Sequence, residues 1–253
     1  MTEVLRTFLF AWQFLTAVPL SRSIHDAKPE ELAASMSWYP LVGCVLGALL
    51  VAADWLLAHV FPTEVTSVLL MLLLIGITRG LHQDGLADMV DGLAGGRTAQ
   101  ARLAIMRDGR IGAIGATGLF LALGLRYAGF NTLPVGEHLA LLLGMPVVGR
   151  WAMVVGAFHV TSARMEGGLA QPFLTYLSWR HVCLATLTAG LALTLLLGLW
   201  PALCLLLIGT ALVRLSTVWF HRMFDGVTGD LLGATNEVAE ILFILIVPVV
   251  LFR

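Results

Sequence analysis

Apolar residues form long stretches along this chain, and polar residues collect in the short segments between them. A helix that crosses a bilayer needs about 20 mostly apolar residues, and seven stretches approach that length. We therefore expect an all-α fold, a polytopic transmembrane helical bundle of about seven spans that forms a single domain over residues 1–253. The expected spans lie near residues 38–60, 64–80, 111–130, 138–160, 182–199, 202–220 and 238–252.

An eighth apolar stretch, residues 5–19, lies at the N-terminus and is too short to cross a bilayer. We expect an additional helix there that is either interfacial or re-entrant. The stretch lacks the small-residue cleavage site of a signal peptide, so we do not expect it to be removed.

Lysine and arginine are divided unevenly among the connections. The connections at 61–63, 131–137 and 200–201 contain neither residue. Because cytoplasmic loops are enriched in both residues, the remaining connections are predicted to face the cytoplasm. The basic residues of this second set are Arg22, Lys28, Arg97, Arg102, Arg107, Arg110, Arg164, Arg180 and Arg222, and the segments that they place at this face include 81–110, 161–181 and 221–237.

Composition excludes a water-soluble domain. Hydrophobic residues make up 58% of the chain and charged residues 12%, and the mean hydropathy is +0.90. Soluble domains carry about 25% charged residues, so this chain could not cover its surface in water. We expect the lipid bilayer and small molecules as partners, and no nucleic acid. A homo-oligomer is left open.

The segment from His82 to Gly92 is the richest in chemically active side chains. Asp84, Asp88 and Asp91 are spaced i, i+4 and i+7, which puts them on one face if the segment is helical. Clustered carboxylates repel each other, so a cation is needed to hold them ionised together. Oxygen ligands without cysteine suit Mg²⁺. The alternative, a solvated acidic helix end, fits less well at the mouth of an apolar bundle.

His82 precedes Asp84 by two residues, so a continuous helix points it away from the aspartate face. Three roles stay open for it: a general base, a hydrogen-bond donor to phosphate, or an interfacial histidine.

Arginines follow the aspartate segment directly. Arg107 and Arg110 flank a tight turn that leads into an apolar helix, and forked guanidinium donors suit recognition of a diphosphate. Placement at the positive face of the membrane is the alternative explanation. Arg164, on the same predicted side, is a further candidate for substrate contact.

A second acidic segment precedes the last apolar stretch. Asp230, Gly233, Ala234 and Glu237 share a helical face, and the small residues between the two acids leave room for a ligand. Helix capping explains Asp230 but explains Glu240 poorly, because ionisable groups in an apolar run usually face a bundle interior. Since both acidic segments are predicted on one side, they can converge on one site.

Asp54, Arg126 and Arg150 also lie at membrane depth or near an interface. Such charges are functional candidates, although snorkelling towards the surface is an alternative.

The segment from His82 to Asp88, with Asp91-Gly92, resembles the signature of the cobalamin synthase family, the adenosylcobinamide-GDP ribazoletransferases. Gln83 stands where leucine is usual, and Phe224-Asp225 replaces a smaller pair. Four further blocks occur in the family's order and cover nearly the whole chain: Tyr39 to Gly43, Met106 to Gly112, Arg164 to Gly168, and Thr228 to Glu240.

This resemblance implies a transferase of the last stage of cobalamin assembly, which joins α-ribazole, or its 5′-phosphate, to adenosylcobinamide-GDP and releases GMP. It implies Mg²⁺ as the cofactor. The expected metal ligands are Asp84, Asp88, Asp91 and Asp230; the expected catalytic residues are Asp84, His82, Asp88 and Asp91; and the expected substrate-binding residues are Arg107, Arg110, Asp230, Glu237 and Arg164.

Two other functions are weaker alternatives. A CDP-alcohol phosphotransferase also uses an aspartate-rich membrane motif, but its signature requires arginine where Asp88 follows Ala87. A cation-coupled transporter relays ions through acids near mid-membrane, in related halves, whereas no internal repeat appears here.

Overall fold

The computed structural model describes residues 3–20, 27–132, 138–164, 168 and 170–251. In the described residues the regular secondary structure is helical, apart from one isolated β-bridge between Ser162 and Val227. Its elements are α1 (Glu3–Leu15), α2 (Pro29–Ser35), the 3-10 turn η2 (Met36–Trp38), α3 (Tyr39–Leu57), α4 (Thr63–Thr78), α5 (Leu81–Gly95), α6 (Ala99–Ile105), α7 (Ala113–Phe130), α8 (Leu139–Ala157), α9 (Gln171–Tyr176), α10 (Trp179–Leu197), α11 (Leu199–Phe224) and α12 (Gly229–Leu251).

Six helical stretches in the described residues are long and apolar enough to cross a membrane, and there are up to seven if the bent pair α4–α5 counts as one span. The predicted polytopic helical bundle is therefore confirmed, and the chain is a multi-pass membrane protein. Helix α1 has 13 residues and packs against α2 and α3. It is too short to span, as expected.

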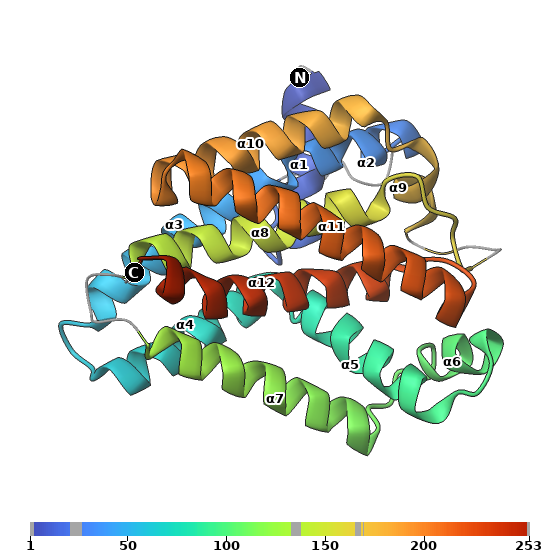
Figure 1. Ribbon diagram of the computed structural model, residues 1–253, viewed down its shortest axis with the longest axis horizontal. Helices are drawn as coiled ribbons and strands as arrows, with labels where there is room; N and C mark the ends of the chain where they lie inside the picture. Colours follow the sequence, from blue (N-terminus) through green and yellow to red (C-terminus); the bar gives the residue numbers. More distant parts are fainter. Residues whose placement is uncertain (1–2, 21–26, 133–137, 165–167, 169, 252–253) are drawn as a thin grey trace.

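Helix α8 is the centre of the bundle. It contacts α3, α10, α11 and α12, and nearly all of its residues are buried. Figure 1 shows it running between the pair α10–α11 and helix α12. The approach of α3 depends on glycine, because a Cβ on Gly43 would lie 2.5 Å from the carbonyl oxygen of Pro146. Small residues allow this close contact between membrane helices.

A sharp break separates α4 from α5. Arg79 and Gly80 both adopt left-handed backbone conformations, with φ of 56° and 66°, and the two helices meet at 90°. Two hydrogen bonds join the break to the residues that follow α1. Arg79 donates from Nη2 to the Thr16 carbonyl at 2.9 Å, and the Ala17 amide donates to the Ile77 carbonyl at 2.6 Å. Backbone groups freed at membrane depth thus find partners inside the protein.

The structure corrects the expected limits of two segments. Residues 81–95 were expected as part of a connection, but they form α5, which packs against α7 and α12. Helix α12 starts at Gly229 rather than near residue 238, so both acids of the second segment lie within it. In each case packing against neighbouring helices extends the helix into a sequence that is too polar to be read as a span.

The connections divide between the two ends of the bundle (Figure 1). Those from α5 to α7, from α8 to α9 and from α11 to α12 gather at one end, and those from α3 to α4 and from α10 to α11 lie at the other. Arginines occur at the first end, which agrees with the predicted division of charge. Of the connection 131–137, residues 133–137 lie outside the described part.

Candidate active site

The three aspartates of the first acidic segment lie on helix α5, as the spacing predicts. Asp84 is exposed, and Asp88 and Asp91 are half-buried. The carboxylate of Asp88 interacts electrostatically with those of Asp84, Asp91 and Asp230 and with the guanidinium of Arg164. Asp84, Asp88, Asp91 and Asp230 are called the acidic patch below.

The crossing of α5 and α12 brings the two acidic segments together, as expected. Gly85 packs so closely on α12 that a Cβ there would lie 2.5 Å from the carbonyl oxygen of Asp230. One turn along, a Cβ on Gly233 would lie 3.4 Å from the Cα of His82. Residues of the first and the last acidic segments therefore share one surface, although about 140 positions separate them in the sequence.

This contact predicts the effect of a single methyl group. Gly85→Ala is expected to destabilise the protein by about 1–3 kcal/mol, because the new Cβ would overlap backbone and force the helices apart. Thermal unfolding in detergent measures the change. Gly124→Ala on α7 is the matched control, since a Cβ at that position meets nothing within 4 Å. Equal unfolding temperatures for the two variants would contradict the close packing of α5 on α12.

Arg164 reaches the acidic patch through a short backbone pairing. The Val227 amide donates to the Thr161 carbonyl at 2.9 Å, and the Ala163 amide donates to the Val227 carbonyl at 3.0 Å. This pairing joins the segment after α8 to the segment before α12. Arg164 then donates from Nη2 to Oδ2 of Asp230 at 2.7 Å. Residues 165–167 of the family-like block lie outside the described residues.

Asp91 caps the N-terminus of α7. Its Oδ2 accepts from the Gly112 amide at 2.6 Å, and its Oδ1 accepts from the Gly115 amide at 2.7 Å. A carboxylate at this position also interacts favourably with the helix dipole. Asp91 therefore links the aspartate helix to α7, and a metal contact through its remaining lone pairs stays a prediction.

Arg107 and Arg110 lie in the exposed turn before α7. Arg110 forms a bidentate pair with Asp108, with nitrogen–oxygen distances of 3.1 and 2.9 Å, and 83% of its side chain is exposed. The paired carboxylate raises the pKa of the Arg110 guanidinium, which therefore stays charged. Binding of a diphosphate by these two arginines stays a prediction.

His82 and Glu237 lie deeper than the acidic patch. His82 is 1% exposed, and its Nε2 has no hydrogen-bond partner among the described residues. It points away from the exposed Asp84, as the helical spacing predicts. Glu237, also 1% exposed, accepts from Gln83 Nε2 at 3.1 Å and from Arg126 Nη2 at 2.9 Å. Neither residue shares the surface on which the four aspartates meet.

Arg126 and Arg150 do not snorkel, contrary to the simpler alternative. Each is 1% exposed. Arg126 donates to Glu240 at 2.7 Å as well as to Glu237, and Arg150 also donates to Glu240. The apolar sequence around each arginine indicated that its burial costs free energy, but only the fold shows that both arginines pair with glutamates. The set Gln83, Arg126, Arg150, Asn236, Glu237 and Glu240 is called the core network below.

The acidic patch is chemically suited to a hard divalent cation. Its donors are carboxylate oxygens, and Asp88 experiences repulsion from the three other carboxylates. Within the described residues, no group of three acidic, histidine or cysteine side chains encloses a metal position by itself. Mg²⁺ commonly takes one or two carboxylates and completes its shell with water and substrate phosphates, so the donor set fits this ion.

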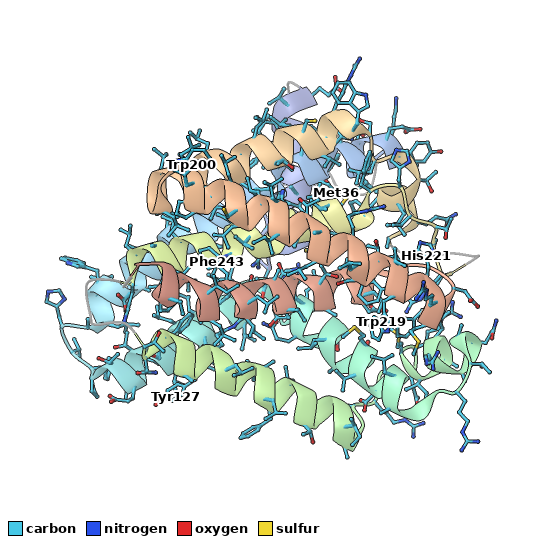
Figure 2. All side chains as sticks on the ribbon, viewed as in Figure 1. Met36, Tyr127, Trp200, Trp219, His221 and Phe243 are labelled. Atoms are coloured by element: carbon cyan, nitrogen blue, oxygen red, sulfur yellow. The ribbon has the colours of Figure 1, made fainter. Side chains whose placement is uncertain are left out.

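An apolar cavity of about 910 Å³ lies between α11 and α12, with α8 as its floor. Trp200 and Trp219, near opposite ends of α11, both line it, and so does Phe243 of α12 (Figure 2). The cavity reaches Met89, the residue after Asp88 on α5. An apolar space thus extends along the membrane-spanning helices to the edge of the candidate site.

Comparisons with known proteins agree with this description. A family model described as cobalamin-5-phosphate synthase matches residues 7–248. An adenosylcobinamide-GDP ribazoletransferase of Syntrophobacter fumaroxidans is 39% identical over 236 residues, which cover 92% of this chain and 94% of that protein. Proteins of the same name from Geotalea daltonii and Chlorobaculum tepidum are 38% and 34% identical, over 94% and 91% of this chain and 95% and 90% of their own lengths.

No solved structure matches the chain. The family model covers almost every helix, including α5 with its aspartates, the turn before α7, and all but the end of α12. Relatives of this similarity align over nine-tenths of their length. The chain belongs to the cobalamin-5-phosphate synthase family.

Proposed function

We propose that this protein is an adenosylcobinamide-GDP ribazoletransferase whose active site is the acidic patch. The observation that carries the proposal is the convergence of aspartates from α5 and α12 on one surface, in a chain that matches the family along nearly its whole length. A ribose hydroxyl of α-ribazole, or of its 5′-phosphate, would form the new bond to phosphorus. The diphosphate bond would break, and GMP would leave with the bridging oxygen.

Each residue at the acidic patch would have a role that follows from its chemistry. One or two carboxylates from among Asp84, Asp88, Asp91 and Asp230 would hold Mg²⁺, and water and substrate phosphates would complete its shell. When bound, the ion neutralises charge on the diphosphate and on the departing GMP. Arg164, held beside Asp230 at 2.7 Å, would contact non-bridging phosphate oxygens. A carboxylate of the patch would accept the proton of the attacking hydroxyl.

The two exposed arginines would bind the diphosphate of the substrate. Arg107 and Arg110 lie in the turn before α7, whose N-terminus Asp91 caps. Their side chains are exposed, so they can reorient toward an incoming diphosphate, and the fork geometry of arginine suits two phosphate oxygens at once. Arg110 would exchange its bond to Asp108 for one to the substrate.

The acidic patch would face the cytoplasm of a bacterial inner membrane. It lies towards the end of the bundle at which the arginine-containing connections gather (Figure 1), and such connections are retained on the cytoplasmic side. The nucleotide-activated substrate would therefore reach the patch from the cytoplasm.

The purified full-length protein in liposomes tests this function directly. With adenosylcobinamide-GDP and either α-ribazole or its 5′-phosphate, we expect adenosylcobalamin, or its phosphate, and GMP in equal amounts. EDTA should abolish both products and excess Mg²⁺ should restore them, because the carboxylates alone cannot neutralise the diphosphate. Absence of product with both acceptors would contradict the proposal, and turnover of a CDP-alcohol under the same conditions would favour the rival phosphotransferase.

A further inference from the structure

The core network ties together the four helices around the acidic patch. Gln83 belongs to α5, Arg126 to α7, Arg150 to α8, and Glu237 and Glu240 to α12, and none is more than 6% exposed. Hydrogen bonds join every pair of neighbours in this order: Gln83 to Glu237, Glu237 to Arg126, Arg126 to Glu240, and Glu240 to Arg150. Two arginines and two glutamates give the network no formal net charge.

The network is adjacent in sequence to the acids of the patch. Gln83 immediately precedes Asp84 on α5, and Glu237 follows Asp230 by about two helical turns on α12. The Gln83–Glu237 hydrogen bond of 3.1 Å therefore joins α5 and α12 close to the level at which Asp84 and Asp230 face each other. Since α5 is not continuous with α4, its rotation depends on lateral contacts of this kind.

Stability alone does not account for this arrangement. A buried ion pair often contributes no more than a packed apolar pair of the same size, because desolvation offsets the attraction. Moreover, Arg126 Nε and Nη1 and Gln83 Oε1 find no hydrogen-bond partner among the described residues, and such atoms cost free energy when buried. What directional bonds supply, and apolar packing does not, is a fixed rotation of each helix.

We propose that the core network is a positioning element for the transferase reaction, with Glu237 at its centre. Glu237 acts through Asp84 and Asp230, by fixing the rotation and separation of α5 and α12, and does not contact the substrate. The inference rests on the proposed function of the patch. It replaces the expected substrate contact of Glu237 with a contact to Gln83 and Arg126.

A charge-balanced pair of substitutions tests the role. Glu237→Gln and Arg126→Gln each leave the buried network with one uncompensated charge. Each is expected to lower kcat by about 100-fold, the effect of misplacing reacting groups by about 1 Å. The KM of both substrates should stay within about twofold. The double variant keeps the Arg150–Glu240 pair and offers Gln83 an amide, so kcat should return to within about tenfold of wild type.

Hydrogen exchange of the α5 backbone gives a readout that needs no substrate. Exchange over residues 84–91 should rise in both single variants and return toward wild type in the double variant. Leu50→Ala is the stability control, because Leu50 is 1% exposed and lies on α3, a helix that carries no member of the acidic patch or of the core network. It should lower the unfolding temperature without changing kcat or exchange in α5.

Three results would overturn the inference. A raised KM that the double variant fails to restore would mean that Glu237 contacts the substrate. Unchanged kcat in the single variants would mean that the network stabilises the fold but does not position the reacting groups. Unchanged hydrogen exchange of α5 in those variants would show that the network does not position α5. This result would count equally if the wild-type protein proved inactive. Inactivity of the wild-type protein would by itself refute only the proposed function.

Discussion

Replacing Asp88 with alanine is expected to lower turnover by about 100- to 1,000-fold. Asp88 lies at the centre of the acidic patch, facing three other carboxylates and Arg164. Removing it takes away a metal ligand and the balance of charge around the diphosphate, and the loss of one such electrostatic group costs about 10²–10³ in rate. Asp84→Ala should behave similarly, because Asp84 lies on the same face of α5.

The measurement is formation of cobalamin and GMP across a Mg²⁺ titration. Glu64→Ala is the matched control: it also removes one exposed carboxylate, but from the first turn of α4 at the opposite end of the bundle. It should retain wild-type turnover. If Asp84→Ala and Asp88→Ala both retained wild-type turnover while folding normally, the acidic patch would not be the active site.

Replacing Glu240 with leucine is expected to destabilise the protein by about 3–5 kcal/mol. Glu240 accepts hydrogen bonds from both Arg126 and Arg150, and all three side chains are at most 1% exposed. Without it Arg150 would be a buried cation without its anion, which is the costly way to break an ion pair. A large fall in unfolding temperature in detergent, or loss of the folded protein from the membrane, would be the observed result.

The double variant Glu240→Leu/Arg150→Leu separates charge from packing. It removes both members of the pair and leaves Arg126 with Glu237, so most of the lost stability should return. If the double variant were less stable than Glu240→Leu alone, uncompensated charge would not be the cause. Arg150 would then stabilise the bundle through packing of its aliphatic portion.

Hydrophobic patterning predicted the long apolar helices of the fold, including the buried helix α8. The stretches that became α7, α8, α10 and α11 were located to within a few residues, because only a helix satisfies its own backbone in a bilayer. The break at Arg79–Gly80 was not predicted. Glycine is expected in a left-handed conformation, but Arg79 is held there by Thr16, a contact across more than 60 positions that no local pattern encodes.

The candidate site was predictable where chemistry repeats along one helix. The i, i+4, i+7 spacing placed Asp84, Asp88 and Asp91 on one face, and topology placed Asp230 on the same side. Pairings between helices were not predictable. Nothing local to Asp91 shows that it caps α7, and nothing in the apolar run around Arg126 shows that Glu237 and Glu240 face it. Those contacts depend on which helices become neighbours.

Because of the break between α4 and α5, the tilt of α4 can change while α5 keeps its orientation. A helix that spans a membrane without interruption tilts when the surrounding lipid thins or thickens, and every side chain along it moves. Here such a tilt of α4 can be absorbed at two left-handed residues. Because α5 packs against α12 and α7, we expect the direction in which its aspartates point to be preserved in membranes of different lipid composition.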